Sequence, residues 1–152
     1  MLIRPGALED AEATARIHVD SWAAAYTLRG PSFQQRLDLH RRVPPSFVAE
    51  VDGRIAGFVG VGPSRDPDAD GELYVIYVHP AHWGAGVGRE LIRAGEARMR
   101  ELGHRRVVLW VLDDNPRARR FYEAAGWRLD GEQRPIEFLG QTVSEIRYAK
   151  QL

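Results

Sequence analysis

The amino-acid sequence predicts a mixed α/β fold, with one sheet and helices on both of its faces. Strand-like and helix-like segments follow one another in the order β-α-α-β-β-β-α-β-α-β-β. Segments 72–79 and 106–112 are apolar on both faces, which is typical of strands buried inside a layered fold. The 152 residues, of which 44% are hydrophobic, are enough for one core, so we expect residues 1–152 to form a single domain.

The individual elements follow from the period of the apolar residues and from the turn residues between them. Strands are predicted at 1–4, 47–51, 55–61, 72–79, 106–112, 127–131 and 142–149. Helices are predicted at 8–19, 21–26, 33–42, 87–102 and 116–125. The Asp52-Gly53 pair between two of these strands indicates a hairpin turn, because both residue types tolerate positive φ.

The composition excludes several classes of function. There are 21 basic and 21 acidic residues, a net charge of +0, and no long run of one sign, so a nucleic-acid or anionic-membrane surface is not expected. The chain has no cysteine, which excludes disulfides, thiolate zinc sites and cysteine nucleophiles. The first residues lack the apolar core of a signal peptide and no stretch approaches about 18 apolar residues, so we expect a cytoplasmic protein.

The stretch 79–91, HPAHWGAGVGREL, places three glycines directly before a predicted helix. Glycine costs about 0.5–1 kcal/mol in regular structure, so something should approach this backbone closely. A helix N-terminus offers free N–H groups and about half a positive charge, which together bind anions. The loop alone leaves two interpretations open, a phosphate site and glycines that serve only tight packing at a strand–helix turn. The residues of the candidate phosphate site are Gly84, Ala85, Gly86, Val87, Gly88 and Arg89.

Other ligand motifs fit this stretch poorly. A P-loop needs Lys-Ser/Thr after its last glycine, whereas Gly88 is followed by Arg89 and Glu90. A dinucleotide fingerprint needs its third glycine where Arg89 stands. His79 and His82 have metal-ligand spacing but no third convergent ligand, so we expect no metal.

A second segment, NPRARRFYEAAGW at 115–127, follows one strand later. Asn115 and Pro116 suit the N-cap and the first position of a helix. Phe121 faces the core, and Tyr122 points about 100° away around the helix. Taken alone, Tyr122 would be an ordinary residue at the rim of an amphipathic helix.

Together the two segments resemble the GCN5-related N-acetyltransferase family. Its cofactor motif, Arg/Gln-x-x-Gly-x-Gly/Ala, follows the fourth strand, and Trp83–Gly88 matches both glycines but not the first position. Segment 115–127 is similar to the family's Asn-x-x-Ala-x-x-Phe-Tyr-Glu-x-x-Gly-Phe, with Trp127 as the last aromatic. The resemblance covers residues 1–150 in element order. It implies a mostly antiparallel sheet of about six or seven strands that splays at the fourth and fifth.

The resemblance implies an acetyl-CoA-dependent N-acetyltransferase without a metal. The glycine loop would hold the diphosphate, and the pantetheine arm would lie between strands 72–79 and 106–112. There it would pair with the backbone of Ile76, Tyr77 and Val78, with Asn115 close by. The alternative is a non-catalytic acyl-CoA-binding or regulatory module on the same fold. Tyr122 favours the enzyme and Trp83 favours the alternative.

The implied reaction is direct attack of a primary amine on the thioester in a ternary complex, through a tetrahedral oxyanion. The family-like donor to the oxyanion is the N–H of Val78. Tyr122 is the candidate acid that protonates the leaving thiolate. Glu72 is the best candidate base, and the alternatives are that water takes the proton and that Glu72 is a solvated acid beside Asp68 and Asp70.

The acceptor is predicted only by class, as a small-molecule amine or a peptide amine. Trp22 and Tyr26 lie four residues apart on one helical face, where the family places its acceptor site, and Tyr74 shares strand parity with Glu72. Core packing is the alternative role for Trp22 and Tyr26. The resemblance also allows a homodimer, since many relatives dimerise and the chain ends in strands that can pair across subunits.

Overall fold

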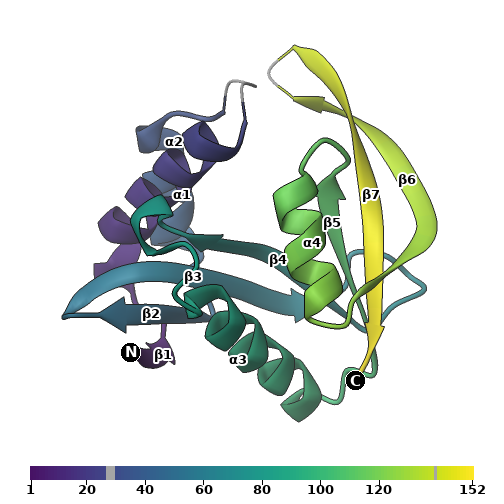
Figure 1. Cartoon of the computed structure of the whole chain (residues 1–152), viewed down its shortest axis with the longest axis horizontal. Coiled ribbons are helices and arrows are strands. Elements are labelled where there is room, and N and C mark those ends of the chain that lie inside the picture. Colours follow the sequence, from purple (N-terminus) through teal and green to yellow (C-terminus); the bar gives the residue numbers. More distant parts are fainter. Residues whose placement is uncertain (27–29, 139) are drawn as a thin grey trace.

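The computed structural model describes residues 1–26, 30–138 and 140–152, and within them the strands form one seven-stranded sheet (Figure 1). The strands are β1 (Leu2–Pro5), β2 (Phe47–Val51), β3 (Arg54–Pro63), β4 (Gly71–Val78), β5 (Arg106–Leu112), β6 (Arg128–Phe138) and β7 (Gln141–Gln151). The helices are α1 (Ala11–Ala25), α2 (Phe33–Arg42), α3 (Val87–Glu101) and α4 (Pro116–Ala124), with short 3-10 turns η1 (Leu8–Asp10) and η2 (Pro80–His82).

The sheet has the strand order β1-β2-β3-β4-β5-β7-β6. Every neighbouring pair is antiparallel except β4 and β5, which run parallel. These two strands pair only where Gly71–Glu72 meets Val107–Val108, and beyond that point they lead away from each other (Figure 1). The predicted mostly antiparallel sheet, splayed at its fourth and fifth strands, is confirmed.

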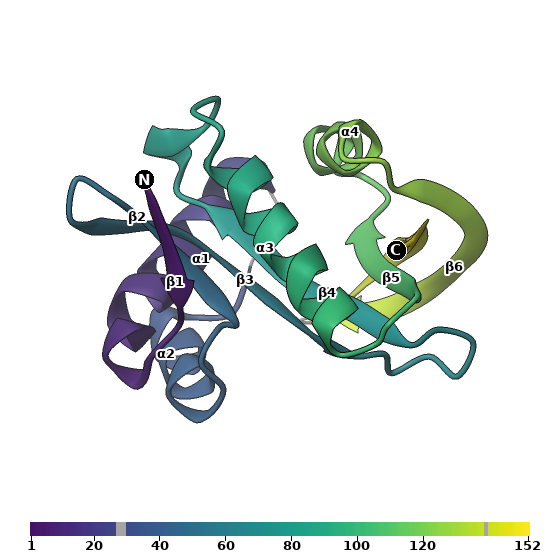
Figure 2. The same ribbon diagram turned by 90° about the horizontal axis from the view of Figure 1, so that it is seen from below.

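The helices cover both faces of the sheet, as predicted. Figure 2 shows α1 and α2 on one side and α3 and α4 on the other. The larger core lies under α3 and α4, where Leu91 and Met99 pack in one cluster with Trp127 and Tyr148. On the opposite face Ile17 of α1 packs in a smaller cluster. Among the described residues, no helix combines the length and the apolar character needed to cross a membrane.

Two element boundaries differ from the prediction. Segment 21–26 is not a separate helix, because α1 continues unbroken through Ala25. The strand predicted at 127–131 is longer, since β6 runs to Phe138 across Gly131 and Pro135. An edge strand tolerates both residues, and β6 is at the edge of the sheet, with a register shift between Leu129 and Gln133.

Candidate active site

A cavity of about 1020 Å³ lies where β4 and β5 separate. It is lined by most of the predicted cofactor residues, namely Ile76, Tyr77, Val78, Gly84, Gly86, Val87, Gly88, Arg89 and Asn115. Tyr122 and Tyr26 line it as well. The predicted residues that are not part of its lining are Ala85, Glu72, Trp22 and Tyr74. The structure thus brings the two sequence motifs to one site but leaves two of the predicted polar groups outside it.

The three glycines before α3 are needed for different reasons. Gly84 and Gly86 have φ values of +81° and +83°, and a Cβ at either would meet no atom within 4 Å. Glycine is favoured there because the backbone is left-handed, and the space beside it is open to a ligand. Gly88 is different, since its Cβ would come within 3.0 Å of the Phe121 ring. Packing explains Gly88, while Gly84 and Gly86 shape an open loop at the N-terminus of α3.

The backbone of β4 presents hydrogen-bonding groups to the gap. The N–H of His79 donates to Ala56 O at 2.8 Å, and Tyr77 is paired with Phe58 in the same antiparallel register. Bonded and non-bonded pairs alternate in an antiparallel ladder, so the N–H and C=O groups of Ile76 and Val78 point away from β3. The neighbour on that side is β5, which has already left the ladder. A chain inserted in the gap would find these groups in strand geometry.

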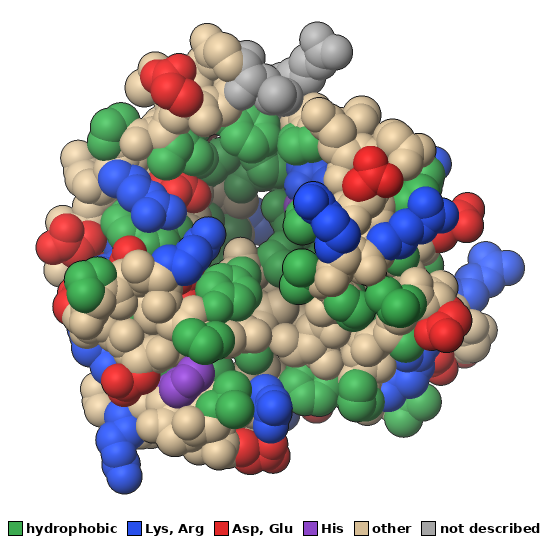
Figure 3. All heavy atoms as spheres, turned by 180° about the vertical axis from the view of Figure 1, so that it is seen from behind, with side chains coloured by type: hydrophobic (Ala, Val, Ile, Leu, Met, Phe, Trp, Pro, Cys, Tyr) green, Lys and Arg blue, Asp and Glu red, His purple; other side chains and the backbone are tan. Residues whose placement is uncertain are grey.

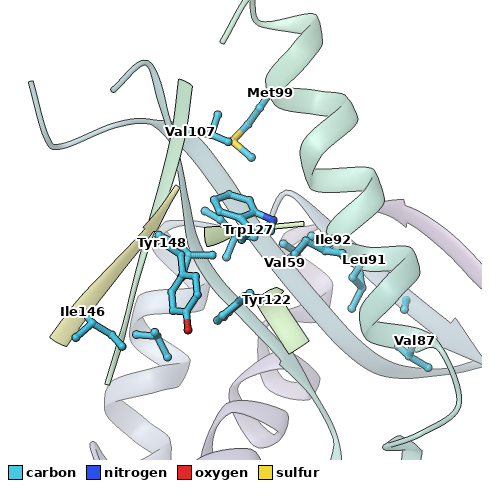
Figure 4. Packing of buried hydrophobic residues seen from close by; sticks show 14 of the residues in the cluster. Val59, Val87, Leu91, Ile92, Met99, Val107, Tyr122, Trp127, Ile146 and Tyr148 are labelled. Carbon is cyan, nitrogen blue, oxygen red and sulfur yellow. The ribbon is translucent and has the colours of Figure 1, made fainter. Parts of the chain in front are cut away.

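Tyr122 projects from α4 into the larger core beside the cavity. Figure 4 shows Tyr122 between Tyr148 of β7 and the residues Leu91 and Ile92 of α3. Its side chain is only 8% exposed, and the residue lines the cavity. Burial, with smaller contributions from Tyr77 and Tyr26, raises its pKa above the ordinary value. The phenol therefore stays protonated and can act as a donor at the cavity wall.

Asn115 ties α4 to α1 across the cavity. Its Oδ1 accepts from the N–H of Ala118 at 3.1 Å, so it caps α4 as its sequence position predicts. Its Nδ2 donates to the hydroxyl of Tyr26 at 2.5 Å. Burial raises the pKa of Tyr26 as well. The same amide thus fixes the start of the helix that carries Tyr122 and the orientation of a tyrosine on the α1 side.

Trp83 occupies the position where the family motif has arginine or glutamine. Its indole N–H donates to Val78 O at 2.8 Å, and the Ser21 hydroxyl donates to the same oxygen at 3.1 Å. The guanidinium carbon of Arg117 lies 3.3 Å from the centroid of the Trp83 ring. A cation from α4 is therefore brought beside the loop through the aromatic ring. Sequence reasoning missed Arg117 and Ser21, and no local signal marks either residue.

Glu72 lies at the closed end of the gap, where β4 still pairs with β5. Its side chain is 1% exposed, and it accepts a hydrogen bond from the Arg65 N–H at 3.0 Å and forms an ion pair with the Arg65 guanidinium. It is neither the solvated acid considered from the sequence nor a group that lines the cavity. The role of Glu72 as the base stays a prediction, and its carboxylate is held by Arg65 away from the cavity lining.

Tyr74, like Glu72, does not line the cavity, and β4 is irregular at this residue. Gly60 pairs with Val75 but Val61 pairs with Leu73, so Tyr74 bulges out of the ladder and the predicted parity is lost. Its hydroxyl donates to Pro63 O, and the guanidinium carbon of Arg65 lies 5.3 Å from its ring. Trp22 packs at 4.4 Å from the Tyr26 ring and stacks at 5.1 Å on Phe138, so it supports the cavity wall from behind.

The histidine pair has separate roles in the structure. His79 accepts the N–H of Ala81 at Nδ1, and its Nε2 lies 3.2 Å from Asp20 Oδ2. His82 lines the cavity. In the part of the chain that the structure describes, no three histidine or carboxylate side chains come together as metal ligands.

Comparison with known proteins identifies the family. The model of the acetyltransferase (GNAT) family matches residues 11–127. An uncharacterized N-acetyltransferase of Bacillus subtilis (strain 168), YuaI, is 32% identical over 127 residues, which are 75% of this chain and 73% of that protein. A mycothiol acetyltransferase of Thermomonospora curvata is 41% identical over 81 residues, which are 53% of this chain. The match covers only 27% of that relative's length.

The fold agrees with the family. The structure of YncA from Salmonella typhimurium, solved with its cofactor acetyl-CoA, matches with a TM-score of 0.74 at 24% identity. The match covers 99% of this chain and 93% of that one. With a family model over most of its length and a relative of similar size above 30% identity, the chain belongs to the acetyltransferase (GNAT) family and is an N-acetyltransferase.

Proposed function

We propose that this protein transfers the acetyl group of acetyl-CoA to a primary amine, on a small molecule or a peptide, by direct attack in a ternary complex. The observation that carries the proposal is that two backbone segments with open hydrogen-bonding groups meet at one cavity. The Ile76 groups and the N–H of Val78 on β4 face the gap, while Val78 O is taken by Trp83 and Ser21, and the open loop at Gly84 and Gly86 also lines the cavity.

The residues present fit acetyl-CoA. The space that a Cβ at Gly84 or Gly86 would enter is free, and it adjoins the N-terminus of α3, where amide N–H groups favour a diphosphate. Arg89 and Arg93 also line the cavity and add positive charge there. The β4 backbone at Ile76 suits the amides of a pantetheine arm, by the pairing that adds a strand to a sheet edge. When bound, acetyl-CoA supplies an acetyl group activated as a thioester.

Two groups of the chain are placed to assist the transfer. The N–H of Val78 donates to the acyl carbonyl oxygen, which gains negative charge as the amine nitrogen bonds to the acyl carbon. The hydroxyl of Tyr122 donates to the sulfur as the carbon–sulfur bond breaks. Its reference pKa of about 10 already exceeds the value of about 8.5 for a thiol, and burial widens the gap, so Tyr122 shares its proton rather than giving it up early.

The amine must also lose one proton. Because Arg65 holds the carboxylate of Glu72 outside the cavity, we assign this proton to water in the cavity and not to Glu72. One proton leaves nitrogen and one reaches sulfur, so the overall reaction yields an N-acetyl amide and free CoA thiol.

Two glycines provide a matched test of cofactor binding. Gly86 and Gly103 have nearly the same φ, +83° and +82°, and a Cβ at either meets nothing within 4 Å. Alanine at either position should therefore cost the same stability, about 1–2 kcal/mol for a left-handed residue. Only Gly86 lines the cavity, so calorimetric titration should show acetyl-CoA bound at least about tenfold more weakly by Gly86→Ala than by Gly103→Ala. Equal affinities would remove the loop as the diphosphate site.

The reaction itself is tested by a screen of primary amines with acetyl-CoA, read as release of free thiol. The proposal expects at least one amine to raise thiol release well above the rate in water. If acetyl-CoA binds tightly and no amine raises the rate, the transfer reaction is refuted while the binding site stands.

A further inference from the structure

Arg36 of α2 is a buried cation that has no acidic partner in the part of the chain that the structure describes. Its side chain is 7% exposed, and its Nε and Nη2 atoms are buried without a hydrogen-bond partner among residues 1–26, 30–138 and 140–152. No carboxylate acts on its charge among the described residues, and the remaining residues, Thr27, Leu28, Arg29 and Leu139, carry no acid. A buried charge left unpaired is costly, which is why a partner for it is expected.

The third nitrogen of Arg36 is engaged by a chain of neutral groups. Nη1 donates to His18 Nε2, because a guanidinium can only donate. His18 Nδ1 must then donate to His40 Nε2 at 3.3 Å, and His40 Nδ1 to the Thr14 hydroxyl at 3.0 Å. Thr14 in turn donates to the backbone oxygen of Asp10 at 3.1 Å. This series of hydrogen bonds fixes the guanidinium in place, and its members contribute no negative charge.

Both histidines stay neutral in this arrangement. Burial, together with the charge of Arg36, lowers the pKa of His18 to about 2 and that of His40 to about 4. Near neutral pH they therefore add no positive charge of their own beside Arg36. The site has one net positive charge, held rigidly.

The two unpaired atoms share one edge of the guanidinium. Nε and Nη2 donate side by side, in the geometry that binds both oxygens of a carboxylate. Two other arginines of this protein bind a carboxylate through the same edge. Nε and Nη2 of Arg65 hold Glu72, and Nε and Nη2 of Arg134 hold Glu145. At Arg36 the edge is present, and none of the carboxylates that the structure describes binds it.

This edge lies behind the wall of the cavity. The guanidinium carbon of Arg36 is 5.5 Å from the ring of Trp22, which packs on Tyr26 of the cavity wall. The phenol of Tyr77, also in the wall, is within reach of the charge of Arg36, and burial and Tyr26 oppose the effect of that charge on its pKa. Figure 3 shows that the face opposite to that of Figure 1 is hollowed near its centre and edged mainly by hydrophobic side chains.

We propose that the acceptor amine carries a carboxylate, and that the Nε–Nη2 edge of Arg36 binds it while the amine points into the cavity. The inference rests on the proposed acetyl transfer. Because the indole of Trp22, packed on Tyr26 and Phe138, lies beside the guanidinium, the proposal requires this ring to be displaced when the carboxylate binds. Aromatic groups around a single buried cation suit an amino acid or a short peptide better than a polyamine or an aminosugar, which bring no anionic group.

The test compares acids with their amides. Free L-amino acids and dipeptides are offered with acetyl-CoA, each beside its C-terminal amide, and kcat/KM is read as thiol release. The wild type should use its best acid at least about tenfold better than the matching amide, because charge-assisted hydrogen bonds are lost in the amide. In Arg36→Gln the ratio should fall to within about twofold, and in Arg36→Lys, which keeps the charge but not the fork, to an intermediate value.

Two controls separate the possible failures. The first control is Arg41→Gln, which removes an exposed arginine from the same helix and should leave the acid-to-amide ratio unchanged. The second control is the acetyl-CoA affinity of the Arg36 variants, which should equal that of the wild type if the variants are folded. Equal use of acids and amides by the wild type, or a ratio that survives Arg36→Gln, overturns the inference while acetyl transfer stands.

A thermal-shift measurement tests carboxylate binding even if the amine screen shows no acetyl transfer. Acids but not their amides should raise the Tm of the wild type, and neither should raise the Tm of Arg36→Gln. Equal shifts overturn the inference independently of the reaction.

Discussion

Tyr122→Phe removes one oxygen from the proposed acid and leaves its ring in place. General acid catalysis typically contributes about 10²–10⁴-fold to a rate. The pKa of Tyr122 is raised and lies above that of a thiol, so in the transition state the phenol shares its proton with the sulfur and does not transfer it fully. We therefore expect an effect at the lower end of this range, a decrease in kcat of at least about tenfold, or about 1.4 kcal/mol. Because the phenol stays neutral, this decrease should be the same from about pH 7 to pH 9.

The structure also predicts what this substitution leaves unchanged. Tyr122 lines the cavity, and the substitution removes only its hydroxyl. The ring keeps its contacts with Phe121 and Tyr148, at 5.5 Å and 6.2 Å between centroids. We therefore expect a change in unfolding free energy of less than about 0.5 kcal/mol and an unchanged acetyl-CoA affinity.

Tyr148→Phe is the matched control. Its hydroxyl donates to Glu123 Oε2 at 3.0 Å and accepts from Arg119 Nε at 3.2 Å, so its loss should cost about 1–3 kcal/mol of stability and leave kcat unchanged. Single-turnover thiol release at saturating acetyl-CoA and amine measures the chemical step. An unchanged single-turnover rate in Tyr122→Phe, or an equal loss in both variants, would refute the role of Tyr122 as the acid.

Three further predictions concern groups around the site. Glu72→Gln should lower Tm, since it weakens the buried pair with Arg65, but should not move the acid limb of the kcat/KM profile; a moved limb would restore Glu72 as the base. Trp83→Arg loses the stacking of Arg117 but brings its own cation, so the acetyl-CoA Kd should change by less than about tenfold in calorimetry, and a larger change would make the indole itself essential. The lowered pKa of His18 means that stability is complete above its unfolded value of about 6.5 and falls as the pH drops below it, so the urea midpoint should decline from pH 6.5 to 4.5 in the wild type and decline less in His18→Gln.

Local signals predicted most of the fold. The hairpin turn at Asp52-Gly53 has both residues at positive φ, and α3 ends before Gly103 at a φ of +82°. Asn115 caps its helix with its own side chain. In each case the residue type determines the backbone conformation within a few positions, so no tertiary information is needed.

The sequence predicted those parts of the site whose residues lie within one short contiguous motif. The glycine loop and the segment around Tyr122 are contiguous motifs, and they meet at one cavity. Glu72 and Tyr74 do not line the cavity, because one irregularity in β4 changes which side chains share a face, and the sequence does not mark it. Edge position, which explains the length of β6 through Pro135, is likewise a property of the assembled sheet.

Long-range pairings were beyond the sequence. The contact of Arg117 with Trp83 joins two elements that only the fold brings together. In the sequence Arg36 is one more charged residue of an amphipathic helix, and its significance depends on the absence of an acid among the described residues around it. That absence is a property of all its neighbours at once, from α1 to β4.

The most direct test of the account is a crystal structure of the protein with a non-hydrolysable thioether analogue of acetyl-CoA. The account predicts the diphosphate at the amides of Gly84–Arg89 and the arm between β4 and β5. It further predicts the acyl oxygen within about 3.2 Å of the Val78 N–H and the sulfur within about 4 Å of the Tyr122 hydroxyl. An analogue bound outside this gap, or bound in it with the sulfur remote from Tyr122, would contradict the account.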